Sequence, residues 1–142
     1  MTGASRGYSR STDVGELRTE IPEDFRIDEE EHVRGTTTVL AVHGDADMNG
    51  AEELEARLTE VIDERPAVLV LDLSGVTFLD STILAVLLHG LKRLGAAGGR
   101  LRIVTARPEI RRTFELTLLD RLFQLDSSRE EALAATASQP EN

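Results

Sequence analysis

A hydroxyl next to a carboxylate, Ser81 beside Asp80, is the pair of side chains in this sequence that is best placed to carry chemistry. A continuous apolar run at residues 68–71 precedes the pair and is typical of a buried strand, and apolar residues at helical spacing follow it at 83–94. Ser81 is therefore expected at the tip of a sheet and at the N-terminus of a helix. A phosphate on its hydroxyl would add a charge of about −1.5 to −2, which the helix N-terminus would partly accommodate.

The residues leave two assignments of the helix cap open. Ser and Asp both lead the residues found at the N-cap, and loss of such a cap costs about 1 kcal/mol. Either Ser81 is the cap and Asp80 orients its hydroxyl, or Asp80 is the cap and Ser81 is the first helical residue. Leu84 stands where a capping box would need Glu or Gln, so that motif does not account for the hydroxyl of Ser81.

Apolar periodicity and turn residues predict the elements that must position this pair. The predicted strands span residues 25–33, 36–42, 67–71, 100–105 and 122–125, and the predicted helices span 48–63, 82–94, 108–116 and 128–137. Asp47 or Asn49 is expected to cap the first helix, and Ser128 with Glu131 forms a capping box before the last one. This order of elements predicts an α/β fold, a mixed sheet with helices packed against it.

Length and composition bound the organisation of the chain and exclude several classes of function. The 142 residues suffice for one domain, expected at residues 25–137 between a disordered extension at 1–24 and a flexible tail at 138–142. The absence of Cys excludes thiolate chemistry, and the three His residues lack metal-ligand spacing, so no metal or other cofactor is expected. A net charge of −10 argues against nucleic acid as a partner. No apolar run approaches the length of about 18 residues that spans a membrane, so we expect a cytoplasmic protein without direct membrane insertion.

The segment from Asp72 to Leu84, D-L-S-G-V-T-F-L-D-S-T-x-L, resembles the signature of STAS domains, in particular the anti-sigma factor antagonists of the SpoIIAA and RsbV type. The similarity runs from about residue 33 to about residue 133. It implies a STAS-like mixed sheet of four to five strands with helices packed against it. In that family the first Ser after the Asp is the phosphorylation site, which on this sequence is Ser81, and Thr82 is the second hydroxyl of the pattern.

The resemblance also implies a surface for partner binding around Ser81. Asp47 lies in the segment V-H-G-D-A-D, which is similar to the family's G-E-[LI]-D turn, and in the family that Asp lies near the phosphorylated Ser. Asp47, Asp80, Ser81 and Thr82 are therefore expected to contact a partner. Ile83 stands where the family usually has Gly, and we expect it to reshape the docking surface.

The function implied by this resemblance is a phosphorylation-controlled interaction, and the chain itself is not expected to be an enzyme. The unphosphorylated form would bind an anti-sigma factor that is also a serine kinase and would release the sigma factor, a form of partner switching that regulates transcription. Phosphorylation of Ser81 would end binding, and a Ser/Thr phosphatase would reset the switch. The alternative is a constitutive STAS binding module, such as an accessory subunit of a lipid-transport complex. A receiver domain is excluded because Lys92, the only lysine, falls in a predicted helix instead of at a strand end.

Overall fold

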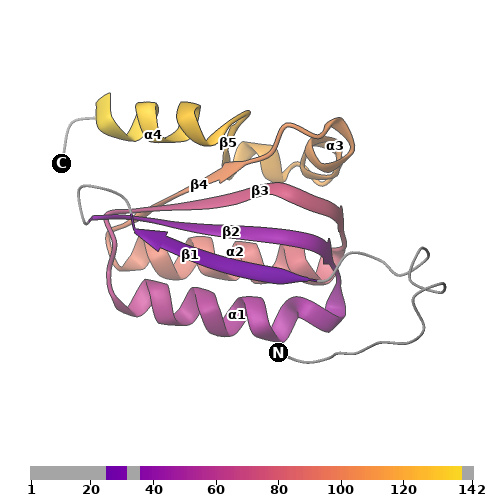
Figure 1. Ribbon diagram of the computed structural model, residues 1–142, viewed down its shortest axis with the longest axis horizontal. Coiled ribbons are helices and arrows are strands. Elements are labelled where there is room, and N and C mark those ends of the chain that lie inside the picture. The colour runs from indigo at the N-terminus through magenta and orange to yellow at the C-terminus, as the bar shows by residue number, and fades with distance from the viewer. Residues whose placement is uncertain (1–24, 32–35, 139–142) are drawn as a thin grey trace, which may run out of the picture.

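The computed structural model describes residues 25–31 and 36–138, so the predicted extension at 1–24 and nearly all of the predicted tail lie outside the described residues. Within these residues, five strands form one mixed sheet in the order β1-β2-β3-β4-β5 (Figure 1). The strands are β1 (Arg26–Glu31), β2 (Thr37–Ala46), β3 (Val68–Leu79), β4 (Arg100–Val104) and β5 (Gln124–Asp126). β1 is antiparallel to β2, and the other neighbouring strands are parallel. The expected α/β fold with a mixed sheet is confirmed.

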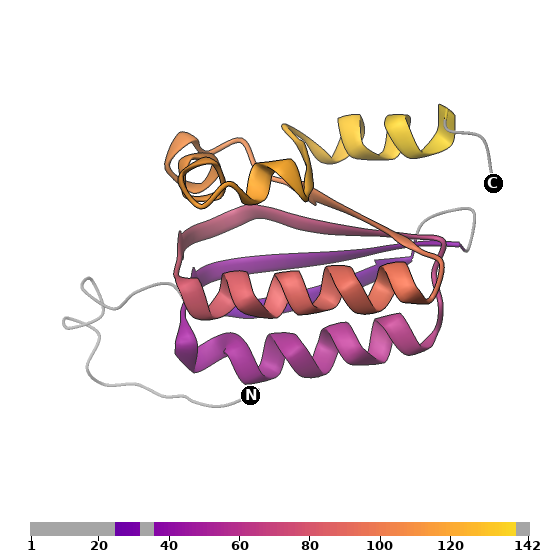
Figure 2. The same cartoon turned by 180° about the vertical axis from the view of Figure 1, so that it is seen from behind.

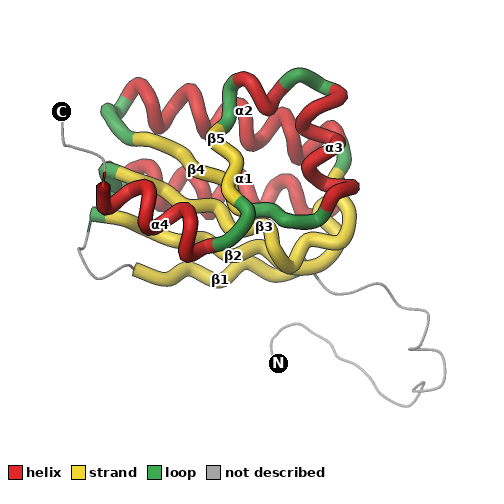
Figure 3. The backbone as a smooth tube through the Cα atoms, turned by 90° about the horizontal axis from the view of Figure 1, so that it is seen from above, coloured by secondary structure: helices red, strands yellow, loops and turns green. Residues whose placement is uncertain are grey.

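Helices cover both faces of the sheet. α1 (Met48–Asp63) and α2 (Ser81–Ala96) lie side by side against one face, and α4 (Arg129–Ser138) lies over the other (Figures 1 and 3). α3 (Pro108–Leu116) and the short 3-10 helix η2 (Leu119–Arg121) follow β4 at the end of the sheet where α2 begins (Figure 2). The observed bounds of α1 and α3 are those expected from the sequence. None of the helices in the described part of the chain is long and apolar enough to cross a membrane.

The main core lies between the sheet and the α1–α2 layer. Leu40, Leu71 and Leu87 are fully buried there, and Phe114 of α3 packs edge-on against Phe123 with ring centroids 5.6 Å apart. A second, smaller cluster lies beneath α4, and its members are Val39, Val68, Val70, Val104 and Ala132. Burial on both faces explains why the centre of β3 reads as a continuous apolar run instead of an alternating one.

Two partly buried ion pairs fix α4 and β5 on the sheet. Nε of Arg129 donates to Oδ2 of Asp72 at 3.0 Å, and Nη1 donates to Glu30 at 2.7 Å. Nη2 of Arg129 forms an ion pair with the same Asp72 oxygen at 2.9 Å. Burial alone would lower the pKa of Arg129, but its hydrogen bonds and charge interactions with Asp72 and Glu30 outweigh burial and raise it. Arg102 of β4 donates to both carboxylate oxygens of Asp126 at 2.8 and 3.0 Å. These paired charges hold the elements in a defined arrangement over the smaller cluster.

Two strands are longer than the sequence indicated. β2 was expected to end at residue 42 and continues to Ala46, and β3 was expected to end at residue 71 and continues to Leu79. The added halves pair with each other, with His43 opposite Gly75 and Ala46 opposite Leu79, across irregularities in the register. Polar residues in these two segments interrupt the apolar alternation that indicates a strand. The segments are strands because they pair with each other, which local sequence does not reveal. Because β2 and β3 pair up to Ala46 and Leu79, the residues that follow the two strands lie close together.

Smaller differences occur at the two edges of the sheet. β1 begins at Arg26 and ends at Glu31, within the expected 25–33, and residues 32–35 lie outside the described part. β5 comprises Gln124–Asp126 instead of residues 122–125, so Leu122 precedes the strand. The capping box of α4 is present in a shifted form: Ser128 Oγ accepts from the backbone N–H of Glu131 at 3.0 Å, and the Glu131 carboxylate accepts from Ser127 N.

Candidate functional site

Asp80 caps α2 and also α1. Its backbone is extended, with φ −112° and ψ 179°, and its Oδ1 accepts from the backbone N–H of Ile83 at 3.1 Å. Its Oδ2 accepts from the backbone N–H of Met48, the first residue of α1, at 3.1 Å. One carboxylate therefore joins the N-termini of two helices. This decides between the two open assignments: Asp80 is the cap, and Ser81 is the first helical residue.

Asp47 lies directly beside Asp80 in this arrangement. It is the N-cap of α1, one of the two residues expected at that position, and its Oδ1 accepts from the backbone N–H of the other, Asn49, at 3.0 Å. The backbone N–H of Asp80 in turn donates to the carbonyl of Ala46 at 3.3 Å. The two aspartates are brought together by the extended ends of β2 and β3. The positive ends of two helix dipoles stabilise the two carboxylates at one corner of the molecule.

Ser81 presents its side chain to solvent at this corner. It is exposed, and within the described residues its hydroxyl makes no hydrogen bond, so the oxygen is free to react or to contact a partner. Both carboxylate oxygens of Asp80 are engaged with backbone N–H groups, so the structure does not show the orientation of the Ser81 hydroxyl by Asp80 that the first cap assignment implied. Thr82 is exposed as well, so exposure alone does not separate the two hydroxyls.

Ile83 is a core residue and not a surface residue. Its side chain is 1% exposed and belongs to the main core cluster beneath α2. The expectation that Ile83 reshapes the docking surface is therefore corrected for its side chain, which a partner cannot touch. The Ile83 side chain, which stands where the family usually has Gly, adds apolar packing to the first turn of α2. Ile83 therefore anchors α2 to the core.

Two exposed apolar side chains next to the aspartates were not identified from the sequence. Met48, which follows Asp47, is 68% exposed, and Phe78, two residues before Asp80, is 50% exposed. The signal in the sequence is a large apolar residue within two positions of each cap aspartate. Exposed Met and aromatic side chains are typical anchors of protein–protein contacts.

The charge around these residues is negative. Residues 44–56 contain five acidic residues and no basic one, namely Asp45, Asp47, Glu52, Glu53 and Glu55. Among the ion pairs of the described residues, none involves Asp47 or Asp80. No group of His, Asp and Glu in the described part could hold a metal ion. The corner therefore combines the accessible hydroxyl of Ser81, two exposed apolar side chains and two carboxylates that have no ion-pair partner. This arrangement is suited to binding and to modification of Ser81.

The elements around this corner form a small α/β domain. A family model described as the STAS domain matches residues 27–132. The chain belongs to the STAS domain family.

Individual relatives agree with this assignment. The anti-sigma-F factor antagonist RsfB of Mycobacterium tuberculosis is 35% identical over 95 residues, which cover 67% of this chain and 77% of that protein. The crystal structure of an anti-sigma factor antagonist from Mycobacterium paratuberculosis is 34% identical and superposes with a TM-score of 0.75, covering 81% of this chain and 96% of that one. The structure of the anti-sigma factor antagonist SpoIIAA in its unphosphorylated form, 22% identical with a TM-score of 0.68, covers 83% of this chain and 100% of that one and shows a shared fold.

Proposed function

We propose that this protein is an anti-sigma factor antagonist, which binds an anti-sigma factor and thereby releases a sigma factor. The relatives with more than 30% identity carry that function in their names, and the shared fold covers most of this chain. The observation that carries the proposal is the exposed Ser81 at the first position of α2, next to the cap carboxylate of Asp80, which also holds the N-terminus of α1 where Met48 is exposed. In this role the chain is a binding protein of the cytoplasm and does no chemistry itself.

Phosphorylation of Ser81 is the proposed control of binding. The Ser81 Oγ attacks the γ-phosphorus of ATP bound to the anti-sigma factor, the bond to the bridging oxygen breaks, ADP leaves, and a base of the kinase accepts the hydroxyl proton. The product carries a nearly dianionic group beside the carboxylates of Asp80 and Asp47. Desolvation of this group at a contact surface opposes the complex, and its repulsion from the two carboxylates of the same chain grows where a bound partner excludes water.

The size of this effect is sufficient for a switch. Changing the partner from mostly bound to mostly free requires a difference of about 3–5 kcal/mol in binding free energy. Placing an unpaired charge in a buried contact costs about 2–5 kcal/mol, so one phosphate meets the requirement. A Ser/Thr phosphatase that removes the phosphate would restore binding, and the same repulsion favours the hydrolysis.

The proposal is tested with a phosphate-affinity gel of wild-type protein and of Ser81→Ala and Thr82→Ala after incubation with ATP and lysate of the native host. Thr82→Ala is the matched control, because Thr82 is the neighbouring exposed hydroxyl. We expect a retarded band in wild type and in Thr82→Ala, and none in Ser81→Ala. A band that persists in Ser81→Ala, or no band under any growth condition, would overturn Ser81 as the switch and leave a constitutive binding module.

A further inference from the structure

α4 packs on the sheet with few buried side chains of its own. Among the residues of α4 whose side chains the structure describes, Ala132 is buried and Leu133 is partly buried against the smaller cluster. By contrast, α1 and α2 each bury six residues. An isolated helix of ten residues is marginal in water, so α4 depends on its contacts with the sheet.

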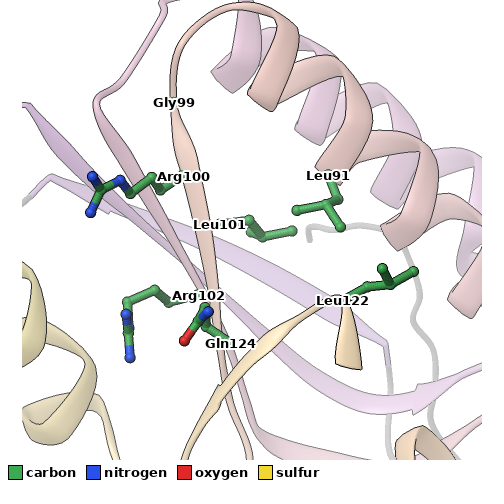
Figure 4. Close-up of a pocket in the computed structure, with 7 residues that line it drawn as sticks. All are labelled: Leu91, Gly99, Arg100, Leu101, Arg102, Leu122 and Gln124. Atoms are coloured by element: carbon green, nitrogen blue, oxygen red, sulfur yellow. The ribbon is translucent and has the colours of Figure 1, made fainter. Parts of the chain in front are cut away.

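The face of the sheet beneath α4 is apolar. Val39 of β2, Val70 of β3 and Val104 of β4 belong to the smaller cluster and are at most 3% exposed. They lie opposite the main core, because successive side chains of a strand point to opposite faces. Figure 4 shows this alternation at the start of β4, where Leu101 points toward Leu91 of α2 and the arginines on either side of it point away. Movement of α4 off its face would therefore bring apolar surface of the three valines into solvent.

Arg129, the first residue of α4, joins the helix to two strands. Its guanidinium donates to Asp72 of β3 at 3.0 Å and to Glu30 of β1 at 2.7 Å. Asp72 is 7% exposed, so its carboxylate depends on this partner to compensate for its burial. Arg129 therefore stabilises the docked position of α4.

The connection between α4 and the sheet lies at an exposed pair of serines, Ser127 and Ser128. The preceding residue, Asp126, is held in β5 by two hydrogen bonds from Arg102. α4 is also the last element of the described chain. Its movement about the two serines therefore requires no other described helix or strand to leave its place.

We propose that α4 opens from the sheet as a unit while the rest of the domain stays folded, with Arg129 holding the closed position. Opening costs less than global unfolding because few apolar contacts are lost, whereas the main core on the other face of the sheet remains intact. α4 is then a cover whose position controls access to the apolar face of Val39, Val70 and Val104. This property belongs to the free protein and does not depend on the proposed binding of an anti-sigma factor.

The reactivity of single cysteines tests the proposal, because the chain has no native cysteine. Val70→Cys places a thiol beneath α4, and Val42→Cys is the matched control in the main core, since both valines are fully buried. The full-length variants are treated with dithiobis(nitrobenzoic acid) in native buffer, and urea unfolding gives the free energy of global unfolding of each. We expect Val42→Cys to react at the rate that global unfolding allows, and Val70→Cys to react at least about tenfold faster than that rate. Reaction of Val70→Cys at the rate of its global unfolding would overturn the proposal.

Two second substitutions separate opening of α4 from unfolding of the domain. Ile83→Val weakens the main core, which the closed and open forms share, so it should accelerate the reaction of Val42→Cys severalfold and leave that of Val70→Cys unchanged. Arg129→Met removes ion pairs that only the closed form has, so it should accelerate the reaction of Val70→Cys at least about tenfold. If Ile83→Val accelerates both thiols equally, or if Arg129→Met does not accelerate Val70→Cys, α4 does not open as a unit held by Arg129.

Discussion

Removal of the Asp80 carboxylate, which caps α2, should destabilise the protein more than removal of the Asp47 carboxylate, which caps α1. In Asp80→Ala, the backbone N–H groups of Ile83 and Met48 both lose their acceptor at 3.1 Å. Loss of an N-cap costs about 1 kcal/mol, and loss of a second hydrogen bond to a charged group costs about 1.5 kcal/mol. The free energy of unfolding should therefore fall by about 2–3 kcal/mol. Asp47→Ala, which removes one cap bond to Asn49, should cost about 1 kcal/mol.

Urea unfolding followed by circular dichroism measures these differences, provided that the m-value is the same in all variants. Met48→Pro offers a matched control, because proline is favoured at the first helical position and lacks the N–H that donates to Asp80. In a double-mutant cycle, Met48→Pro and Asp80→Ala should show a coupling of about 1 kcal/mol. If the two substitutions are additive, or if Asp80→Ala costs no more than Asp47→Ala, the joint capping of α1 and α2 by Asp80 does not stabilise the fold.

Three further predictions concern the contact surface and the core. Met48→Ala and Phe78→Ala should each weaken binding to the anti-sigma factor by about 1–2 kcal/mol in calorimetry while leaving the melting temperature nearly unchanged, because both side chains are exposed; a shift in melting temperature with unchanged affinity would contradict this. Ile83→Gly should lower the free energy of unfolding by about 3–5 kcal/mol, since it empties a core position, and a near-neutral result would contradict the burial of Ile83. Arg129→Met should cost about 2 kcal/mol by urea unfolding, because the buried carboxylate of Asp72 loses its ion-pair partner; no loss would show that the pair is not stabilising.

Local patterns were sufficient to predict the α-helices to within two residues at each end, but not the 3-10 helix η2. The bounds of α1 and α3 and the cap by Asp47 follow from apolar periodicity, from proline at the first position of α3 and from the preference of Asp for the N-cap, all of which act within one turn of helix. The resemblance to STAS domains then supplied the arrangement of the elements, which the family model and the mixed sheet confirm.

Features that depend on distant residues were not predictable from these patterns. The second halves of β2 and β3 are strands because they pair with each other, and their sequences lack alternation. Asp80 and not Ser81 is the cap, with its second oxygen held by Met48, 32 residues earlier. The exposure of Leu122 was not predicted, because residues 122–125 were assigned to a strand that would have placed Leu122 in the sheet, whereas β5 begins at Gln124.

We propose that modification of Ser81 controls binding of an anti-sigma factor. Calorimetric titration of the anti-sigma factor from the same organism with two forms of this chain, one with Ser81 and one with phosphoserine at that position, tests it most directly. We predict tight binding of the unmodified chain and at least about 100-fold weaker binding of the phosphorylated chain, which corresponds to about 3 kcal/mol or more. Equal affinity of the two forms, or tighter binding of the phosphorylated one, would contradict the switch.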